Sequence, residues 1–257
     1  MSDSKKITEI LPETINVLEK GGVVGGVYKT KDDVTENQCI TGPTFLSSCT
    51  LPDIQPNTKI IGVCGITDLN DSGEPGSIGL ASPKLDGWFY SDFLLFHHLL
   101  EGVAPDQTWL APTYPYTLVK KYKEYVHGDP RKPGTRRVVL DESMLHDGDI
   151  SDWYRVDPKE LLGRVLATIR DECQKSAKSG RPILVLIFSH GTKDTKAIEM
   201  GGYNTEKPNL LTMRKFQEAI GSKAPKAGLC LLTTACFSGG WAINPNLNIT
   251  TMTAQSD

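Results

Sequence analysis

The chain has 257 residues, of which 39% are hydrophobic and 23% charged, and its formal net charge is −3. This length and composition are typical of a globular protein with a sizeable core. The small negative charge disfavours nucleic acid or an anionic membrane as a partner, and no apolar run reaches the roughly 18 residues that a membrane-spanning helix needs.

Residues 1–50 are weakly patterned, and we expect them to form an N-terminal arm or a partial cap. Their GGVVGG stretch (21–26) does not match the G-x-G-x-x-G fingerprint, and no strong strand precedes it. This stretch therefore gives little support to nucleotide binding. The remaining residues, 51–257, are expected to form one domain.

Strand, helix and strand patterns follow one another in the first part of this domain. KIIGVCGI (59–66) is a short β-branched apolar run, typical of a strand covered on both faces. DGWFYSDFLLFHHLLEG (86–102) repeats apolar residues at a helical period and ends at a glycine, which predicts a helix. QTWLAP (107–112) predicts a second strand, and the long polar stretch 113–156 receives no predicted element.

Two later helices begin with capping signals. Asp157, Pro158 and Glu160 fit the N-cap, N1 and N3 positions of a capping box, so a helix is predicted to start there. Its apolar residues then line one face, as expected for a helix that packs on a sheet. In LTMRKFQEAIG (211–221), Thr212 is the predicted N-cap and the final glycine ends the helix.

Further apolar runs predict the remaining strands. PILVLIFSHG (182–191) is the strongest, AIEMGG (197–202) suggests a small β excursion, and GLCLLTTA (228–235) predicts another buried strand. NITTMTA (248–254) predicts a last strand beside the 228–235 strand. Strands that alternate with helices imply parallel βαβ units with helices on both faces. The predicted fold class is therefore α/β, a three-layer αβα arrangement around a mostly parallel, Rossmann-like sheet.

Two of these strands end in reactive residues. One apolar run leads into His190 and another leads into Cys236. Neighbouring parallel strands would place both residues at the carboxyl edge of the sheet, where α/β proteins build their sites. An imidazole there can take the thiol proton and produce a nucleophilic thiolate. We expect Gly191 and Gly239 to let the backbone turn sharply and to let a substrate approach closely.

The two motifs around these residues read Ser189-His190-Gly191 and Ala235-Cys236-Phe237-Ser238-Gly239. Each follows an apolar strand, and one predicted helix separates them. In this order and context the pair resembles the caspase-like cysteine peptidases, the clan of caspases, metacaspases, legumains and separases. The resemblance covers residues 59–257 in element order and the two motifs in residue detail. It implies a caspase-like fold and makes residues 51–257 a caspase-like, large-subunit-like peptidase domain.

The resemblance also implies the chemistry of the site. Cys236 would be the nucleophile and His190 the base of a cysteine endopeptidase that hydrolyses protein or peptide substrates. The backbone amides of Gly191 and Cys236 would form the oxyanion hole.

The substrate pocket is implied less completely. In the resembling families, the last strand and the segment after it form a wall of this pocket, which places Thr234, Ala254 and Ser256 there. Thr234 stands where relatives carry a glutamine or an acidic residue, so no preference for a substrate side chain transfers. The sequence printed here runs to Asp257, and it leaves open whether the C-terminal small-subunit part of the family is missing.

Two other functions compete with this hypothesis. A pseudo-peptidase of the same fold would use the site as a regulatory or binding module, and His190-dependent labelling of Cys236 by a thiol reagent separates the two. A Rossmann-type nucleotide binder is the weakest alternative, because no glycine fingerprint follows the first strand. The oligomeric state and the residue that orients His190 stay open.

No cofactor is implied by the sequence. One acidic cluster could bind calcium, as in some metacaspases, but it lacks the glycine and the closing glutamate of an EF-hand loop. We interpret it as a solvated loop, because a metal site needs convergent ligands. Its members are Asp141, Glu142, Asp147, Asp149 and Asp152.

The cysteines indicate the compartment. All 6 are scattered without a C-x-x-C pair, which disfavours a disulfide framework and a structural zinc site. The N-terminal MSDSKKITEILPE has no apolar stretch typical of a signal peptide. We therefore expect a reducing, cytoplasmic setting.

Overall fold

The structure is a computed structural model. It describes residues 54–68, 78–129, 131–146, 153–201, 209–221, 228–242 and 250–253. Within these ranges no helix is long and apolar enough to cross a membrane. The predicted N-terminal arm, residues 1–50, lies outside the described residues.

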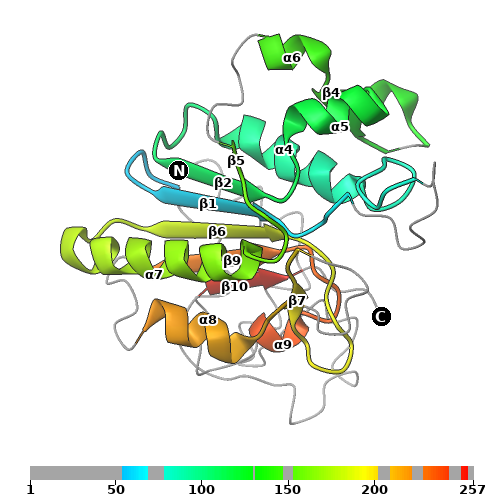
Figure 1. The fold of residues 1–257 in the computed structure, drawn as a ribbon. Coiled ribbons are helices and arrows are strands. Elements are labelled where there is room, and N and C mark those ends of the chain that lie inside the picture. The colour runs from blue at the N-terminus through cyan, green and yellow to red at the C-terminus, as the bar shows by residue number, and fades with distance from the viewer. Residues whose placement is uncertain are drawn as a thin grey trace, which may run out of the picture.

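A parallel sheet of six strands forms the centre of the molecule, in the order β10-β9-β6-β1-β2-β5 (Figure 1). These strands are β1 (Lys59–Cys64), β2 (Gln107–Ala111), β5 (Trp153–Arg155), β6 (Ile183–Phe188), β9 (Leu229–Thr233) and β10 (Thr250–Thr253). The run predicted as a doubly covered strand forms the buried strand β1, and the strongest predicted strand forms the buried strand β6. β10 pairs with β9 in parallel, which confirms the last predicted strand over residues 250–253.

Helices cover both faces of this sheet, which confirms the three-layer α/β prediction (Figure 1). One face carries α4 (Trp88–Leu100), α5 (Pro115–Tyr122), α6 (Glu142–His146) and the antiparallel hairpin of β3 (Tyr125–His127) and β4 (Arg137–Leu140). The other face carries α7 (Leu161–Ser179), α8 (Met213–Ile220) and the short α9 (Gly239–Ala242).

Strand β1 divides the core between the two faces. Ile60 belongs to the apolar cluster beneath α4, whereas Ile61 and Val63 belong to the cluster beneath α7 and α8, because successive side chains of a strand point to opposite faces. Gly62 lacks a side chain for a steric reason, since a Cβ there would lie 2.0 Å from Trp109 Cε3 on the adjacent β2. The indole occupies the space that a β1 side chain would need.

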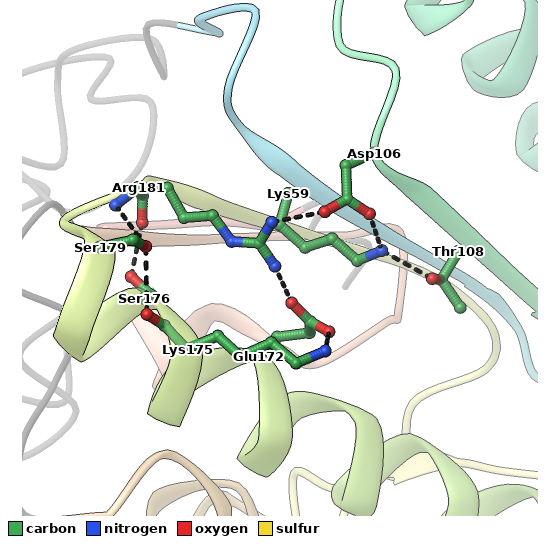
Figure 2. Close-up of polar contacts among 8 residues, drawn as sticks. All are labelled: Lys59, Asp106, Thr108, Glu172, Lys175, Ser176, Ser179 and Arg181. Carbon is green, nitrogen blue, oxygen red and sulfur yellow. Dashed lines mark hydrogen bonds and ion pairs between the residues drawn. The ribbon is translucent and has the colours of Figure 1, made fainter.

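An ion network ties the amino ends of the strands to α7 (Figure 2). Lys59, the first residue of β1, donates to Asp106 Oδ1 at 2.6 Å and to Thr108 Oγ1 at 2.8 Å. Arg181, just before β6, pairs with Asp106 and with Glu172 of α7. These contacts lie at the edge opposite to the carboxyl ends of the strands, so we interpret them as structural.

The polar stretch 113–156, which received no predicted element, contains α5, β3, a short 3-10 helix (Pro133–Thr135), β4, α6 and β5. Few of its residues are apolar, and exposed polar residues separate them, so neither a helical nor a strand period stands out. The buried residues are nevertheless large, and Leu118 and Tyr125 are fully enclosed. The sequence analysis therefore did not predict β5, the strand at one edge of the sheet.

The helix predicted to start at Asp157 begins instead at Leu161. The Asp157 carboxylate accepts from Lys159 N at 2.9 Å, and Asp157 O accepts from Glu160 N at 2.9 Å. The capping residues therefore close a separate turn, and the α-helical hydrogen bonds begin only after it.

The predicted cap of the following helix is confirmed. Thr212 Oγ1 accepts from Lys215 N at 3.3 Å, at the start of α8. The residue before it pairs in β8 (Leu210–Leu211) with β7 (Ile198–Glu199), so the predicted β excursion is a small antiparallel hairpin.

Candidate active site

The segments that carry His190 and Cys236 leave the same edge of the sheet side by side. β6 and β9 are parallel neighbours, with Ile187 in register with Thr233. The pairing continues past the end of β9, because Thr234 N donates to Ile187 O at 3.1 Å. The structure therefore confirms that both predicted residues follow neighbouring strands at the carboxyl edge.

Gly191 brings the two segments into direct backbone contact. A Cβ on this residue would lie 1.8 Å from Cys236 O and 3.1 Å from Cys236 N, closer than non-bonded atoms approach. Gly191 does not have a positive φ. The expected sharp turn is not found at Gly191, because this residue forms an antiparallel bridge with Ile198. The position requires glycine because the Cys236 backbone occupies the side-chain space.

The sharp turn after the thiol lies at Phe237 rather than at Gly239. Phe237 has a φ of 57°, the left-handed region that non-glycine residues rarely adopt, whereas Gly239 is the first residue of α9. Ser238 Oγ donates to Ala235 O at 2.5 Å and so closes the loop around Cys236. Backbone strain of this kind is often found at functional sites.

The backbone of His190 is held by the hairpin that follows it. Glu199 N donates to His190 O at 2.9 Å, and Thr192 N donates to Ala197 O at 2.9 Å. These two bonds flank an antiparallel bridge between Gly191 and Ile198. A residue in such a non-hydrogen-bonded pair turns its amide away from the partner strand, which suits the predicted role of the Gly191 amide in an oxyanion hole.

The imidazole of His190 contacts two residues at the start of α4. Its Nε2 lies 3.0 Å from Asp86 Oδ2, and the two side chains are 28% and 22% exposed. The ring of Phe89 meets the imidazole edge-on, with 4.8 Å between ring centroids. Sequence reasoning missed Asp86, because an aspartate at a predicted helix start is ordinarily interpreted as a cap.

A second carboxylate, Glu199, faces the same region. Burial raises the pKa of Glu199, and the neighbouring His190 partly offsets this effect. Asp86, His190 and Glu199 border one small hollow at the carboxyl edge of the sheet. Its lining residues are Gly65, Ile66, Thr67, Leu80, Asp86, Ser189, His190 and Glu199.

The cysteines of the described residues differ in burial. Cys64, Cys173 and Cys230 are buried, whereas Cys236 is only partly buried. Burial raises the pKa of Cys64 to about 12 and those of Cys173 and Cys230 to about 11. These three thiols therefore stay protonated at neutral pH.

The structure places only part of the predicted substrate pocket. Thr234 lies at the end of β9, and its Oγ1 is buried without a hydrogen bond to any residue in the described ranges. Ala254 and Ser256 lie outside the described residues.

The acidic cluster is also described only in part. Asp141 Oδ1 accepts from Ser143 N at 3.0 Å at the start of α6, which is a capping contact. Asp147, Asp149 and Asp152 lie outside the described residues. Among the residues that the structure does describe, no cluster of histidine, cysteine and carboxylate side chains could hold a metal ion.

Comparisons with protein-family models, with curated proteins and with solved structures found no significant match to this chain. The function must therefore be inferred from the two motifs and from the geometry of the site.

Proposed function

We propose that this chain is a caspase-like cysteine endopeptidase, with Cys236 as the nucleophile and His190 as the general acid and base. The observation that carries the proposal is the contact of Gly191 with the Cys236 backbone at the carboxyl ends of parallel neighbours β6 and β9. The fold, with helices on both faces of a parallel sheet, agrees with the family that the two motifs resemble.

The chemistry follows from these two groups. His190 takes the proton of the Cys236 thiol, and the sulfur attacks the carbonyl carbon of a peptide bond. The backbone amides of Gly191 and Cys236 stabilise the negative oxygen that forms. The carbon–nitrogen bond then breaks, and the imidazolium gives its proton to the leaving amine. Water hydrolyses the thioester with His190 again as base, which releases the acid and the free thiol.

Substitution of the two residues tests the proposal. Cys236→Ala and His190→Ala should each lower kcat/KM on a peptide library by about a thousandfold or more, because nucleophile and base act as a unit. Cys173→Ala and His127→Ala serve as controls and should stay within about threefold of the wild type. Circular dichroism should show both site variants folded, because neither side chain is part of the core. Cleavage by Cys236→Ala at the wild-type rate would overturn the proposal.

A second measurement separates a peptidase from a binding module of the same fold. Brief treatment with iodoacetamide at neutral pH, read by peptide-resolved mass spectrometry, should label Cys236 before Cys64, Cys173 and Cys230, because their raised pKa values keep them protonated. Labelling of Cys236 that depends on His190, without cleavage of any peptide, would favour the binding module. Preferential labelling of a buried thiol would contradict the site itself.

A further inference from the structure

We infer that Asp86 is the positioning residue of this site: it holds the His190 imidazole in place and stabilises the positive charge that the ring acquires from the thiol proton. The inference rests on the proposed function and adds to it a third side chain. Asp86 comes from the turn before α4, whereas His190 follows β6 and Cys236 follows β9.

The contact itself fixes which nitrogen of the imidazole acts as the base. Asp86 Oδ2 lies 3.0 Å from His190 Nε2. A carboxylate oxygen accepts hydrogen bonds and donates none, so a hydrogen bond at this contact requires Nε2 to carry the hydrogen of the neutral ring. Nδ1 is then the basic nitrogen of the neutral ring and the atom that takes the thiol proton. When it does so, the anionic carboxylate lies against a full positive charge, and such charge-assisted bonds are the stronger ones.

A second contact from the same turn restricts the rotation of the ring. The Phe89 side chain is fully buried and meets the imidazole edge-on at 4.8 Å between centroids. Asp86 lies two residues before α4 and Phe89 is the second residue of this helix, and Phe89 N donates to Asp86 O at 3.1 Å. One group therefore contacts a ring nitrogen while the other packs against the ring, and together they restrict the rotation of the imidazole.

The turn that carries Asp86 is itself tightly held. Asp86 N donates to Leu80 O at 3.0 Å, and Gly87 N donates to Ser82 O at 2.9 Å. A Cβ on Gly87 would lie 2.6 Å from Ala81 O, so the backbones of the two residues pack too closely for any side chain at position 87. Gly87 is the N-cap of α4, and no side chain caps the helix. The Asp86 carboxylate thus faces His190 instead of the helix end.

Other titratable groups must be separated from Asp86 in any test. Glu199 on β7 faces the same hollow and interacts electrostatically with His190 and Asp86. Cys236, after β9, is a further titratable group of this site. Asp92 offers a matched control. It lies on α4, the helix that follows the Asp86 turn, but its Oδ1 pairs with a different imidazole, at 3.5 Å from His127 Nε2.

The experiment is the pH dependence of Cys236 alkylation by iodoacetamide in the full chain, read at that residue by mass spectrometry. In the wild type the imidazole should keep the Cys236 thiol reactive at pH 6.5 by taking its proton. Asp86→Asn should slow the reaction about tenfold or more at pH 6.5, because the imidazolium loses its counter-charge. At pH 10 the rate should stay within about twofold of the wild type, because hydroxide then ionises the thiol without the imidazole.

Three further variants make this readout specific. Asp86→Glu should recover part of the rate at pH 6.5, because it restores the charge. Glu199→Gln should change the rate less than Asp86→Asn, and Asp92→Asn should leave the whole profile unchanged. On a peptide substrate, Asp86→Asn should lower kcat about tenfold or more with KM within about twofold, since the carboxylate acts on the base and not on the bound peptide.

The outcomes separate this inference from the proposed function. If Asp86→Asn keeps the wild-type profile while His190→Ala loses reactivity at pH 6.5, the pair stands and the role of Asp86 is wrong. If His190→Ala also keeps the wild-type profile, both are wrong. Nitrogen NMR of His190 in the wild-type chain gives an answer even if Asp86→Asn does not fold: a neutral ring protonated on Nδ1 instead of Nε2 would overturn the inference.

Discussion

At the scale of single residues, the site depends on one place where no side chain fits. Gly191 lies so close to the Cys236 carbonyl that a methyl group would have to displace the backbone of the proposed nucleophile. Backbone hydrogen bonds restrain both stretches of chain against such a shift. His190 O accepts from Glu199 N, and Thr234 N donates to Ile187 O. A side chain at position 191 would therefore shift Cys236 relative to His190, the two residues that we propose as the catalytic pair.

We predict that Gly191→Ala lowers kcat/KM by about a hundredfold or more, because a shift of about 1 Å in a catalytic group has that effect. Gly163→Ala is the matched control. A Cβ there meets nothing within 4 Å on the exposed side of α7, so alanine should raise the free energy of unfolding by about 0.5–1 kcal/mol through its better helix propensity. Peptide cleavage and urea unfolding of both variants check this pair. Wild-type turnover by Gly191→Ala would show that the two segments are not in contact.

The residues of the site were not equally accessible from the sequence. His190 and Cys236 could be predicted because each follows an apolar run, and parallel strands bring such positions together. Asp86 could not, because a tight turn in the loop before α4 carries its carboxylate to His190 and no periodicity encodes that path. The left-handed backbone of Phe237 could not be predicted either, because glycine is the residue that indicates a turn and the nearby glycine is Gly239.

At the scale of elements, the ion network at the amino edge connects β1, β2, β6 and α7 through few groups. Lys59 is 5% exposed and its partner Asp106 is 48% exposed, so the pair lies partly in water. Burial tends to raise the pKa of Asp106, but the hydrogen bonds from Lys59 and Arg181 outweigh this and lower it. The folded chain therefore binds a proton at Asp106 less readily than the unfolded chain does.

The pH dependence of stability follows from that sign. The contribution of Asp106 is fully present above its unfolded pKa of about 3.9 and is lost as the pH falls through the lower folded pKa. We predict that Asp106→Asn lowers the free energy of unfolding by about 1 kcal/mol at pH 7, a value reduced by solvent screening of the half-exposed carboxylate. The difference from the wild type should shrink as the pH falls toward 2, because Asp106 is then increasingly protonated. Urea unfolding at both values tests this, with the exposed Asp171→Asn as control. A difference that persists undiminished near pH 2 would contradict the ionic origin.

The elements themselves were predicted where apolar residues are dense. The runs that form β1, β6 and β9 are short and mostly apolar, and only a buried strand or a short buried helix accommodates such a run. By contrast, β5 has three residues, and only Trp153 of these is buried. Strand β5 is fixed by its pairing with β2 and not by its own sequence, so tertiary contacts would have been needed to predict it.

At the scale of the whole molecule, the site draws its parts from all three layers. Asp86 and Phe89 belong to the start of α4 on one face, and His190 continues the central sheet. The loop after Cys236 enters α9, where Trp241 packs with Phe216 of α8 on the other face. Neither helical layer alone can therefore hold the arrangement.

This arrangement predicts that the site is lost only when the whole molecule unfolds. Two buried thiols report on the layers separately, because Cys64 belongs to the cluster beneath α4 and Cys173 to the cluster beneath α7 and α8. In a urea series, a pulse of alkylating reagent at high pH should begin to label Cys64 and Cys173 at one common urea concentration, as expected for a cooperative transition. In a parallel pulse at pH 6.5, the His190-dependent reactivity of Cys236 should disappear at that same concentration. If Cys236 loses this reactivity while Cys64 and Cys173 are still protected, the site opens as a local unit, and the contacts of His190 with the α4 layer do not couple it to the core.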